Sequence, residues 1–288
     1  MANPTIKIPE DREHLFAHPS FYAEFAPLED YSSFVDSIYV LKDRGRLTAK
    51  RLSFASPLRE LAFSFRDSVP SFEHNGKAVV NEPSFGHRTK GRAFFGWIIG
   101  IKFKPNWSGP LHTEDPMIVA CRNSLARIIR ADPSELDILD SLDELLRALS
   151  PRSQRESMIG SEYFEKSHDR VSDLASRMGG SVRTLHRRMR TSTGFAPKRF
   201  LAMQRFRRSV YEIATRGAGL SVVALNLGFS DQAHLTREFQ RHAGVTPGAF
   251  KQAWRGRHAR AVRFLQDTGS STRLRMVVWP VETTLNSG

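Results

Sequence analysis

Two stretches of the chain repeat one pattern: VSDLASRMGGSVRTLHRRMRTSTGFAPKRF, residues Val171–Phe200, and LSVVALNLGFSDQAHLTREFQRHAGVTPGAF, residues Leu220–Phe250. The first halves of the copies align at an offset of 49 residues and the second halves at 50, because one residue is inserted between Ser230 and Leu235. Apolar residues at helical spacing on either side of a glycine predict two helices joined by a turn in each copy.

The polar and small residues of each copy fall where such helices begin and end. Serines are the predicted N-caps, Ser172 and Ser221 for the first helix and Ser181 and Ser230 for the second. Gly179 and Gly228 are expected to end the first helix in a left-handed conformation. The second helix then buries an apolar pair four residues apart, Leu185 and Met189 in one copy and Leu235 and Phe239 in the other.

The outward residues of the second helix in each copy favour a polyanionic partner. The segment Arg183–Arg190 holds four arginines in eight residues and no acid, whereas a solvated helix surface usually mixes both charges. In the second copy the outward residues are Asp231, Gln232, Ala233, His234, Arg237 and Arg241. Arginine and glutamine are side chains that pair with guanine and adenine edges in the major groove of DNA.

The net charge of +13 lies in the block that contains both copies. Residues 1–164 have 21 basic and 22 acidic side chains, residues 165–263 have 20 and 6, and residues 264–288 have 2 and 2. A hydrophobic content of 40% excludes a disordered polycation. The sequence therefore predicts a basic helical domain attached to a nearly neutral one.

One longer helix, from Lys198 to Arg216, is predicted between the copies. Its inward residues are Leu201, Phe206, Val210 and Ile213, and its outward arginines are Arg199, Arg205, Arg207 and Arg208. A continuous helix would fix the distance between the second helices of the two copies. We expect this distance to be about 34 Å, one turn of duplex DNA.

The N-terminal half has the pattern of antiparallel β-structure. Short runs of β-forming residues lie at Val35–Leu41, Leu61–Phe65, Lys77–Val80 and Ala93–Phe103, which favours a small barrel or sandwich. From Asp115 the pattern becomes helical, with a leucine-rich segment from Leu136 to Leu149 that Pro133 starts and Pro151 ends. Near the end of the chain, Met276–Val281 is either a further strand or a loose segment.

The basic block resembles the DNA-binding domain of AraC/XylS-type transcriptional regulators, from about Ser167 to Arg255 and most specifically in GFSDQAHLTREFQRHAGVTP, Gly228–Pro247. The resemblance implies seven helices with two helix-turn-helix units joined by a long helix. Residues Pro57–Phe65 and Gly100–Pro110 resemble the core strands of cupin-like sensor domains, and Met117–Leu149 corresponds to a segment often used for dimerisation.

The expected fold is thus α+β and multidomain, with a cupin-like barrel, a helical linker and an all-α domain. The expected domains are a β-rich sensor or dimerisation domain at 1–115, a helical segment and linker at 116–164, a tandem helix-turn-helix domain at 165–256 and a tail at 257–288.

Carried over by position, the resemblance implies two sets of DNA contacts. The residues facing bases would be Arg183, His186, Arg187, Gln232, His234 and Arg237, and those facing phosphates Ser181, Arg188, Lys198 and Ser230. The first copy departs from the family pattern, because Gly180 stands where a larger apolar residue is usual and Met189 where an aromatic is usual. Both differences would loosen the first unit.

The alternative is a cupin-like metal enzyme fused to a DNA-binding domain. The ten histidines include no pair one residue apart, and His14 and His18, four apart, adjoin Pro19 and have no Glu-x-x-His pattern. There is no glycine-rich phosphate loop and no nucleophile elbow. We therefore expect no catalytic residue, no metal and no cofactor.

A third alternative is RNA binding, which usually uses aromatic residues exposed on a sheet. The aromatic residues of the basic block are instead expected to face inward: Phe200, Phe206, Phe239 and Phe250.

The remaining expectations concern location and partners. The absence of a secretory signal in Met1–Glu10, of a membrane span and of any cysteine besides Cys121 favours a cytoplasmic protein that associates with the nucleoid when bound to DNA. Cys121 is interpreted as inert core, with a sensor thiol as the alternative. The expected partners are double-stranded DNA, RNA polymerase, a small-molecule effector and a second copy in a homodimer. The sequence predicts a sequence-specific transcriptional regulator.

Overall fold

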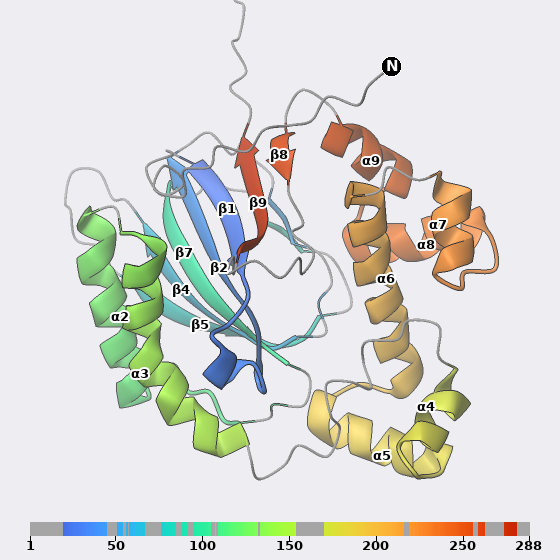
Figure 1. Ribbon diagram of the computed structural model, residues 1–288, viewed down its shortest axis with the longest axis horizontal. Helices are drawn as coiled ribbons and strands as arrows, with labels where there is room; N and C mark the ends of the chain where they lie inside the picture. The colour runs from blue at the N-terminus through green and yellow to red at the C-terminus, as the bar shows by residue number, and fades with distance from the viewer. Residues whose placement is uncertain are drawn as a thin grey trace, which may run out of the picture.

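The computed structural model contains an antiparallel sheet flanked by two groups of helices (Figure 1). Helices α2 and α3 cover one side of the sheet, and helices α4–α9 lie beyond its other side. The structure describes residues 20–44, 51–53, 56, 58–66, 76–84, 88–90, 95–104, 107, 109–131, 133–153, 170–215, 219–255, 259–262 and 274–280. The expected connector at 152–164 and the histidines at 14 and 18 lie almost entirely outside these residues.

Seven strands form the main sheet in the order β5-β4-β7-β2-β1-β9-β8, with every neighbouring pair antiparallel. The strands are β1 (Ser20–Phe25), β2 (Val35–Arg44), β4 (Glu60–Arg66), β5 (Lys77–Asn81), β7 (Phe95–Phe103), β8 (Ala259–Val262) and β9 (Leu274–Pro280). A second, two-stranded sheet pairs β3 (Arg51–Ser53) with β6 (Arg88–Lys90). The four strands predicted in the N-terminal half correspond to β2, β4, β5 and β7.

The sheet formed by the described residues is not closed, so the prediction of a cupin-like barrel is not confirmed. Among the described residues, the outer strands β5 and β8 have a neighbour on one side only and do not pair with each other. The physical reason is that helices, rather than a second layer of strands, cover the apolar face. Phe63 of β4 and Ile99 of β7 belong to the same buried cluster as Leu142 of α3.

Helices α2 (Pro116–Ile128) and α3 (Glu135–Ser153) supply the other half of this core. Asp115 caps α2 by accepting a hydrogen bond from the Met117 amide at 2.9 Å, with Pro116 in the first helical position. Ser134 and Asp137 bond each other's backbone amides at the start of α3, as in a capping box. A short 3-10 turn, η2 (Ile129–Ala131), lies between them, and another, η1 (Glu29–Tyr31), precedes β2.

Two details of α3 differ from the prediction. The helix continues through Pro151 to Ser153, so Pro151 lies inside its last turn, where the missing N–H and the ring clash of proline disturb only the end of the helix. Leu136, expected on the apolar face, is 67% exposed, whereas Ile138 and Leu139 beside it are buried.

The aromatic residues of β7 and its following loop are mainly core. Trp97, Phe103 and Trp107 are buried, and the rings of Phe103 and Trp107 stack with centroids 4.1 Å apart. Phe95, at the start of β7, is 49% exposed, and Phe94 lies outside the described residues. The three buried aromatics are therefore packing residues of the sheet's core.

Cys121 is buried in the α2–α3 interface, where its thiol donates to the Ser141 carbonyl oxygen at 3.4 Å. Burial raises the pKa of this thiol to about 12 because the thiolate would lose its hydration, and the nearby Glu144 carboxylate acts in the same direction. The thiol is therefore protonated at neutral pH, which makes it a poor nucleophile.

The end of the chain returns to the sheet. Strand β9 pairs with β1 in the register Tyr22 to Val278 and Ala23 to Val277, and β8 pairs with the other edge of β9. This is the stretch for which the sequence left a strand or a loose segment open. The helices α4–α9 are thus inserted, in chain order, between two sets of strands of one sheet (Figure 1).

Candidate nucleic-acid interface

The helical part consists of two short helix pairs, a long helix between them and a closing helix. The first pair is α4 (Val171–Arg177) and α5 (Val182–Thr193), the long helix is α6 (Pro197–Thr215), the second pair is α7 (Leu220–Asn226) and α8 (Gln232–Ala243), and the last helix is α9 (Pro247–Arg255). In Figure 1 the two pairs lie near opposite ends of α6.

The two turns have the same backbone. Gly179 and Gly228 have φ angles of 62° and 72°, in the left-handed region that glycine adopts without strain. The amide that follows each of them bonds back across the turn, from Gly180 to the Ala175 oxygen at 3.1 Å and from Phe229 to the Ala224 oxygen at 3.0 Å. The glycine prediction is confirmed at both positions.

The capping predictions hold at only one of four serines. Ser181 caps α5 by accepting from the Thr184 amide at 3.2 Å. Ser172 and Ser221 are not caps, because α4 and α7 begin two residues earlier than predicted and their N-caps are Arg170 and Gly219. At α8 the N-cap is Asp231, which takes the place of Ser181 at the offset of 50 that the inserted residue creates, and Ser230 precedes it.

In α5 and α8, the second helices of the two pairs, the residues predicted to face inward are buried. Leu185 and Met189 of α5 are 2% and 0% exposed, and Leu235 and Phe239 of α8 are both 0% exposed. They belong to two separate clusters, one around each pair, and α6 contributes Phe200 to the first and Phe206 to the second. The long helix therefore forms part of both cores, which ties the two pairs to one scaffold.

Two of the α6 arginines predicted to point outward are engaged within the protein. The Arg205 guanidinium donates to the Gly228 oxygen at 3.3 Å and lies over the Phe229 ring, 5.7 Å from its centroid. Arg207 forms an ion pair with Asp36 of β2 at 3.5 Å, which joins α6 to the sheet. Both side chains are only partly exposed, because α6 has neighbours on more than one side.

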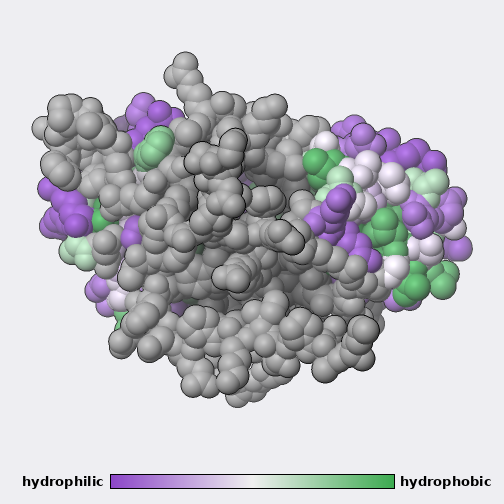
Figure 2. Space-filling view, turned by 90° about the horizontal axis from the view of Figure 1, so that it is seen from above, coloured by the Kyte–Doolittle hydropathy of each residue, from purple (hydrophilic) through white to green (hydrophobic). Residues whose placement is uncertain are grey.

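The proposed base-facing side chains of α5 are accessible. Arg183 and Arg187 are exposed and lie one helical turn apart, and His186 is half-buried. Within the part of the chain that the structure describes, no hydrogen bond or ion pair engages these three side chains. Figure 2 shows that hydrophilic residues form much of the visible surface of the helical part, with scattered apolar areas between them.

The corresponding side chains of α8 are also accessible, but two of them have partners inside the protein. Gln232 is exposed and accepts a hydrogen bond from the Ser221 hydroxyl at 2.7 Å. The His234 ring accepts at Nδ1 from the Ser230 amide at 3.3 Å and meets the Phe229 ring edge-on. Arg237 is exposed, one turn beyond His234. The Ser221–Gln232 pair was missed from sequence, because its two residues are eleven positions apart and lie on different helices.

The proposed phosphate-facing residues form a mixed group. Lys198 is exposed at the start of α6, and Arg188 is half-buried on α5. The Ser181 hydroxyl is the α5 cap, and the Ser230 hydroxyl donates to the Asp231 carboxylate at 3.2 Å. The hydrogen bond from the His234 amide holds the pKa of Asp231 below its ordinary value, with a smaller contribution from Ser230.

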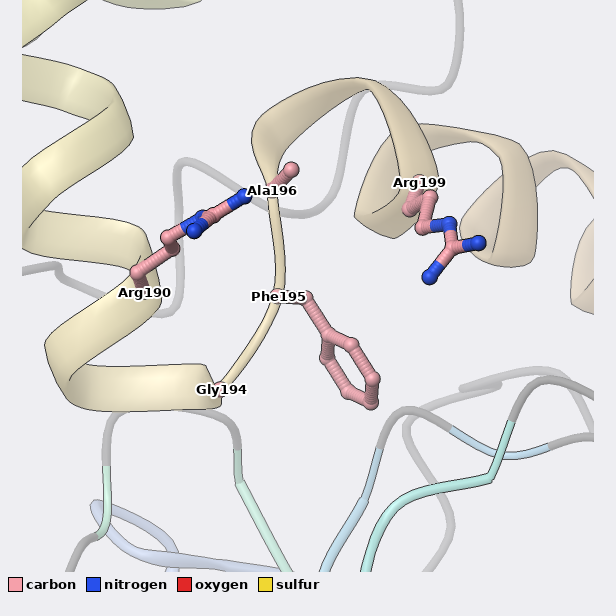
Figure 3. Close-up of a pocket in the computed structure, with 5 residues that line it drawn as sticks. All are labelled: Arg190, Gly194, Phe195, Ala196 and Arg199. Atoms are coloured by element: carbon pink, nitrogen blue, oxygen red, sulfur yellow. The ribbon is translucent and has the colours of Figure 1, made fainter.

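A pocket of about 330 Å³, also missed from sequence, opens at the turn between α5 and α6 (Figure 3). Its lining residues are Arg190, Gly194, Phe195, Ala196 and Arg199. Gly194 ends α5 at a φ of 73°, and the chain then bends sharply into α6, which leaves the two arginines on either side of the bend. These guanidinium groups extend the positive charge of α5 to the beginning of α6.

A metal centre and a membrane-spanning helix would be features of other classes of function. Among the described residues, no group of three or more His, Cys, Asp or Glu side chains is placed to hold a metal ion. None of the described helices combines the length and the apolar character that crossing a bilayer requires.

Comparison with known proteins matches the helical part. The family described as "Helix-turn-helix domain" matches residues 174–253. The HTH-type transcriptional activator RhaS of Escherichia fergusonii is 30% identical over 79 residues, which are 27% of this chain and 28% of that protein. The HTH-type transcriptional regulator RipA of Corynebacterium glutamicum is 38% identical over 80 residues, 28% of this chain and 24% of that protein. The chain thus spans only about a quarter of the length of these relatives.

Solved structures matched by this chain include ToxT from Vibrio cholerae, at a TM-score of 0.38 and 10% identity, covering 82% of this chain and 98% of that one. The C-terminal domain of the response regulator yesN from Fusobacterium nucleatum has a TM-score of 0.29 and 19% identity, covering 31% of this chain and 87% of that one. On the sequence matches and the helices described above, residues 174–253 are a helix-turn-helix domain of the AraC type.

Proposed function

We propose that the protein is a transcriptional regulator that binds specific sites in duplex DNA, with α5 and α8 in adjacent segments of the major groove. The observation that carries the proposal is the duplication. Two helix pairs with the same turn each present an arginine-bearing helix to solvent, Arg187 on one and Arg237 on the other.

The spacing of the pairs supports this proposal. Helix α6 has 19 residues, which at about 1.5 Å per residue is roughly 28 Å. The outward helices are attached near its two ends, so their separation is comparable to the roughly 34 Å of one turn of duplex DNA. Because α6 packs into both cores, this separation would be maintained without DNA.

We assign the base-facing role to Arg183, His186, Arg187, Gln232, His234 and Arg237. The phosphate-facing role goes to Ser181, Arg188, Lys198 and Ser230. The accessible arginines of α5, which have no acid among them, would supply the attraction to the phosphate backbone that makes such binding weaken as salt rises.

The sheet with α2 and α3 would sense a small molecule or mediate dimerisation. Leu136, 67% exposed on α3, is an apolar residue available to a second copy. The ion pair between Arg207 and Asp36 gives a route by which the sheet could influence α6. Because the matched relatives are named as regulators of transcription, we include RNA polymerase among the partners to be tested.

The test uses the full chain and a duplex that it selects from a random pool. In fluorescence anisotropy, Arg187→Ala or Arg237→Ala should each weaken binding to that duplex by about 1 to 3 kcal/mol and relax the preference at one base pair. Arg147→Ala is the matched control, because Arg147 is also an exposed arginine but lies on α3, outside the helix-turn-helix pairs, where it pairs with Asp143 at 2.7 Å.

Unchanged binding by both variants would contradict the proposal. Equal weakening on every duplex sequence would contradict the base-facing assignment and place both arginines on phosphates instead.

A further inference from the structure

The pocket at the turn between α5 and α6 has an arginine on either side of the bend (Figure 3). Arg190 belongs to the last turn of α5 and Arg199 to the first turn of α6, and both side chains are exposed. Among the described residues, the lining includes these two arginines and no acid. The volume of about 330 Å³ far exceeds the roughly 10 to 15 Å³ that one water molecule requires. The pocket is therefore positively charged and large enough for a bound chemical group.

Helical periodicity places Arg190 on the side of α5 that is proposed to face DNA. Arg183, Arg187 and Arg190 are spaced at i, i+4 and i+7, so they share one face of the helix. The seven residues from Arg183 to Arg190 span roughly 10 Å, at about 1.5 Å per residue. The major groove is about 12 Å wide. A helix whose first residues reach base edges therefore brings its last turn towards the rim of the groove, where the phosphates lie.

The sequence around the pocket is basic and contains no acid. Residues 174–211 hold ten lysines and arginines and no aspartate or glutamate. Within the described part of the chain, no hydrogen bond or ion pair engages the Arg190 side chain. Arg199 does interact within the protein, but a guanidinium group has five N–H donors, so one contact does not exhaust them. Guanidinium groups bind phosphate through paired N–H donors, and phosphate is therefore the ligand that suits this pocket.

The second helix pair has the same bend without the basic residues. Gly244 ends α8 at a φ of 73°, as Gly194 ends α5 at 73°. At the offset of 50, the positions of Arg190, Lys198 and Arg199 hold uncharged residues: Gln240, Gly248 and Ala249. The difference between the two bends therefore lies in their side chains and not in the backbone of the turn.

The helix that follows the bend also begins differently in the two pairs. Thr246 caps α9 by accepting from the Ala249 amide at 3.1 Å. Ala196 takes the place of Thr246 before α6 and has no side-chain acceptor, so it cannot bond the equivalent amide of Arg199. Backbone N–H groups at the start of a helix attract anions. The first pair therefore combines two guanidinium groups with a helix start that a bound anion can cap.

Resting on the proposed function, we propose that this pocket binds one phosphate of the DNA backbone, at the rim of the groove segment that α5 occupies. Arg190 and Arg199 are the side chains that hold this phosphate. The contact reads no base, but it fixes the position and orientation of α5 on the duplex, as phosphate contacts do. It belongs to the first pair alone, because the second pair has none of the basic residues at the equivalent bend.

The experiment neutralises single phosphates in a duplex that the full chain selects from a random pool. Each phosphate beside the bases whose preference Arg187→Ala removes is replaced in turn by an uncharged methylphosphonate. At one of these positions the unaltered protein should lose affinity about fivefold, the effect of one hydrogen bond of ordinary strength. Arg190→Ala and Arg199→Ala should each lose a similar amount on the unmodified duplex, with every base preference kept, and should be insensitive to that methylphosphonate. The logarithmic salt dependence of their binding should be less steep by about one unit.

Two matched variants complete the test. Arg190→Lys should stay sensitive to the methylphosphonate because the positive charge remains, and Gln240→Ala, the equivalent exposed position of α8, should bind as the unaltered protein does. Full affinity in Arg190→Ala or Arg199→Ala, an undiminished response of either to every methylphosphonate, or loss of a base preference would overturn the inference while leaving sequence-specific binding intact. Equal binding of the unaltered protein to all duplexes would overturn the proposed function as well, and differs from those outcomes in showing no base preference at any position.

Discussion

The first helix pair, α4–α5, and the second, α7–α8, differ most where each turn enters its outward helix. The second turn places Phe229 there, 6% exposed, with its ring between His234 and the Arg205 guanidinium of α6. The first turn has Gly180, where an added Cβ would meet Thr184 at 3.5 Å and the Met178 oxygen at 4.0 Å. The second outward helix is therefore attached to the long helix through a side chain that the first one lacks.

The core beneath α8 is also packed with more defined geometry than the core beneath α5. Phe239 lies between the rings of Phe206 and Phe250, with centroids 5.2 and 5.5 Å away. Met189 occupies the equivalent place under α5, in a cluster whose other members include Leu174 and Leu201. Aromatic contacts have specific geometry, whereas methionine is unbranched and adaptable. The same helix-turn-helix arrangement therefore holds α8 firmly and leaves α5 more adaptable.

Surface charge shows the opposite distribution. Helix α5 presents arginines with no acid, whereas on α8 Glu238 pairs with Arg241 at 2.6 Å. In the proposed complex with DNA, we therefore expect the first pair to supply most of the attraction to phosphate. We expect the second pair to supply most of the discrimination between bases.

The largest effect expected from this contrast is on local stability. Phe239→Ala should lower the free energy of opening α8 by about 3 to 5 kcal/mol, the usual cost of removing a buried phenyl ring. Met189→Ala, the matched change, should cost α5 about 2 to 3 kcal/mol, since a flexible side chain leaves a site that collapses more easily. Hydrogen exchange of the amides of each helix in the full chain measures both. An equal or larger cost at Met189 would contradict the assignment of the firmer core to the second pair.

A smaller effect separates the two helix caps by pH. Ser181→Ala should cost about 1 kcal/mol at any pH, because the hydroxyl does not titrate. Asp231→Ala should destabilise α8 at every pH at which the Asp231 carboxylate is charged, and not at lower pH. Because hydrogen bonds hold the folded-state pKa of Asp231 below its ordinary value, its contribution is complete above the ordinary pKa of about 3.9 and is lost as pH falls through the lowered folded-state pKa. Thermal unfolding followed by circular dichroism across this range checks the difference. A cost of Asp231→Ala that stays constant down to low pH would show that the carboxylate does not act as a charged cap.

Much of the helical part could be predicted from sequence because local patterns determine it. The glycines of the turns, the inward pairs such as Leu235 and Phe239, and the continuous helix between the copies all follow from spacing and from backbone preferences. The choice of cap could not be read in the same way, because Ser230 and Asp231 are adjacent and both able to cap. Only the helix register determines which one does.

The errors in the sheet have a different cause. Strand β1 pairs on one side with β2 and on the other with β9, from the far end of the chain. Alternating apolar residues show that a segment is a half-buried strand, but they do not show which distant strand lies beside it. The pairing of β9 with β1 was not predicted for this reason, and the contacts of Arg205 and Arg207 were missed because their partners, Gly228 and Asp36, come from other elements.

Selection of bound sites from a random pool of duplexes by the full chain is the most direct test of the central claim. With α5 and α8 in adjacent segments of the major groove, the selected sites should contain two separate blocks of base preference, centred about one helical turn apart. Arg187→Ala should erase the preference in one block and Arg237→Ala the preference in the other. A single block, or loss of the same block in both variants, would contradict the placement of α5 and α8 in adjacent segments of the major groove.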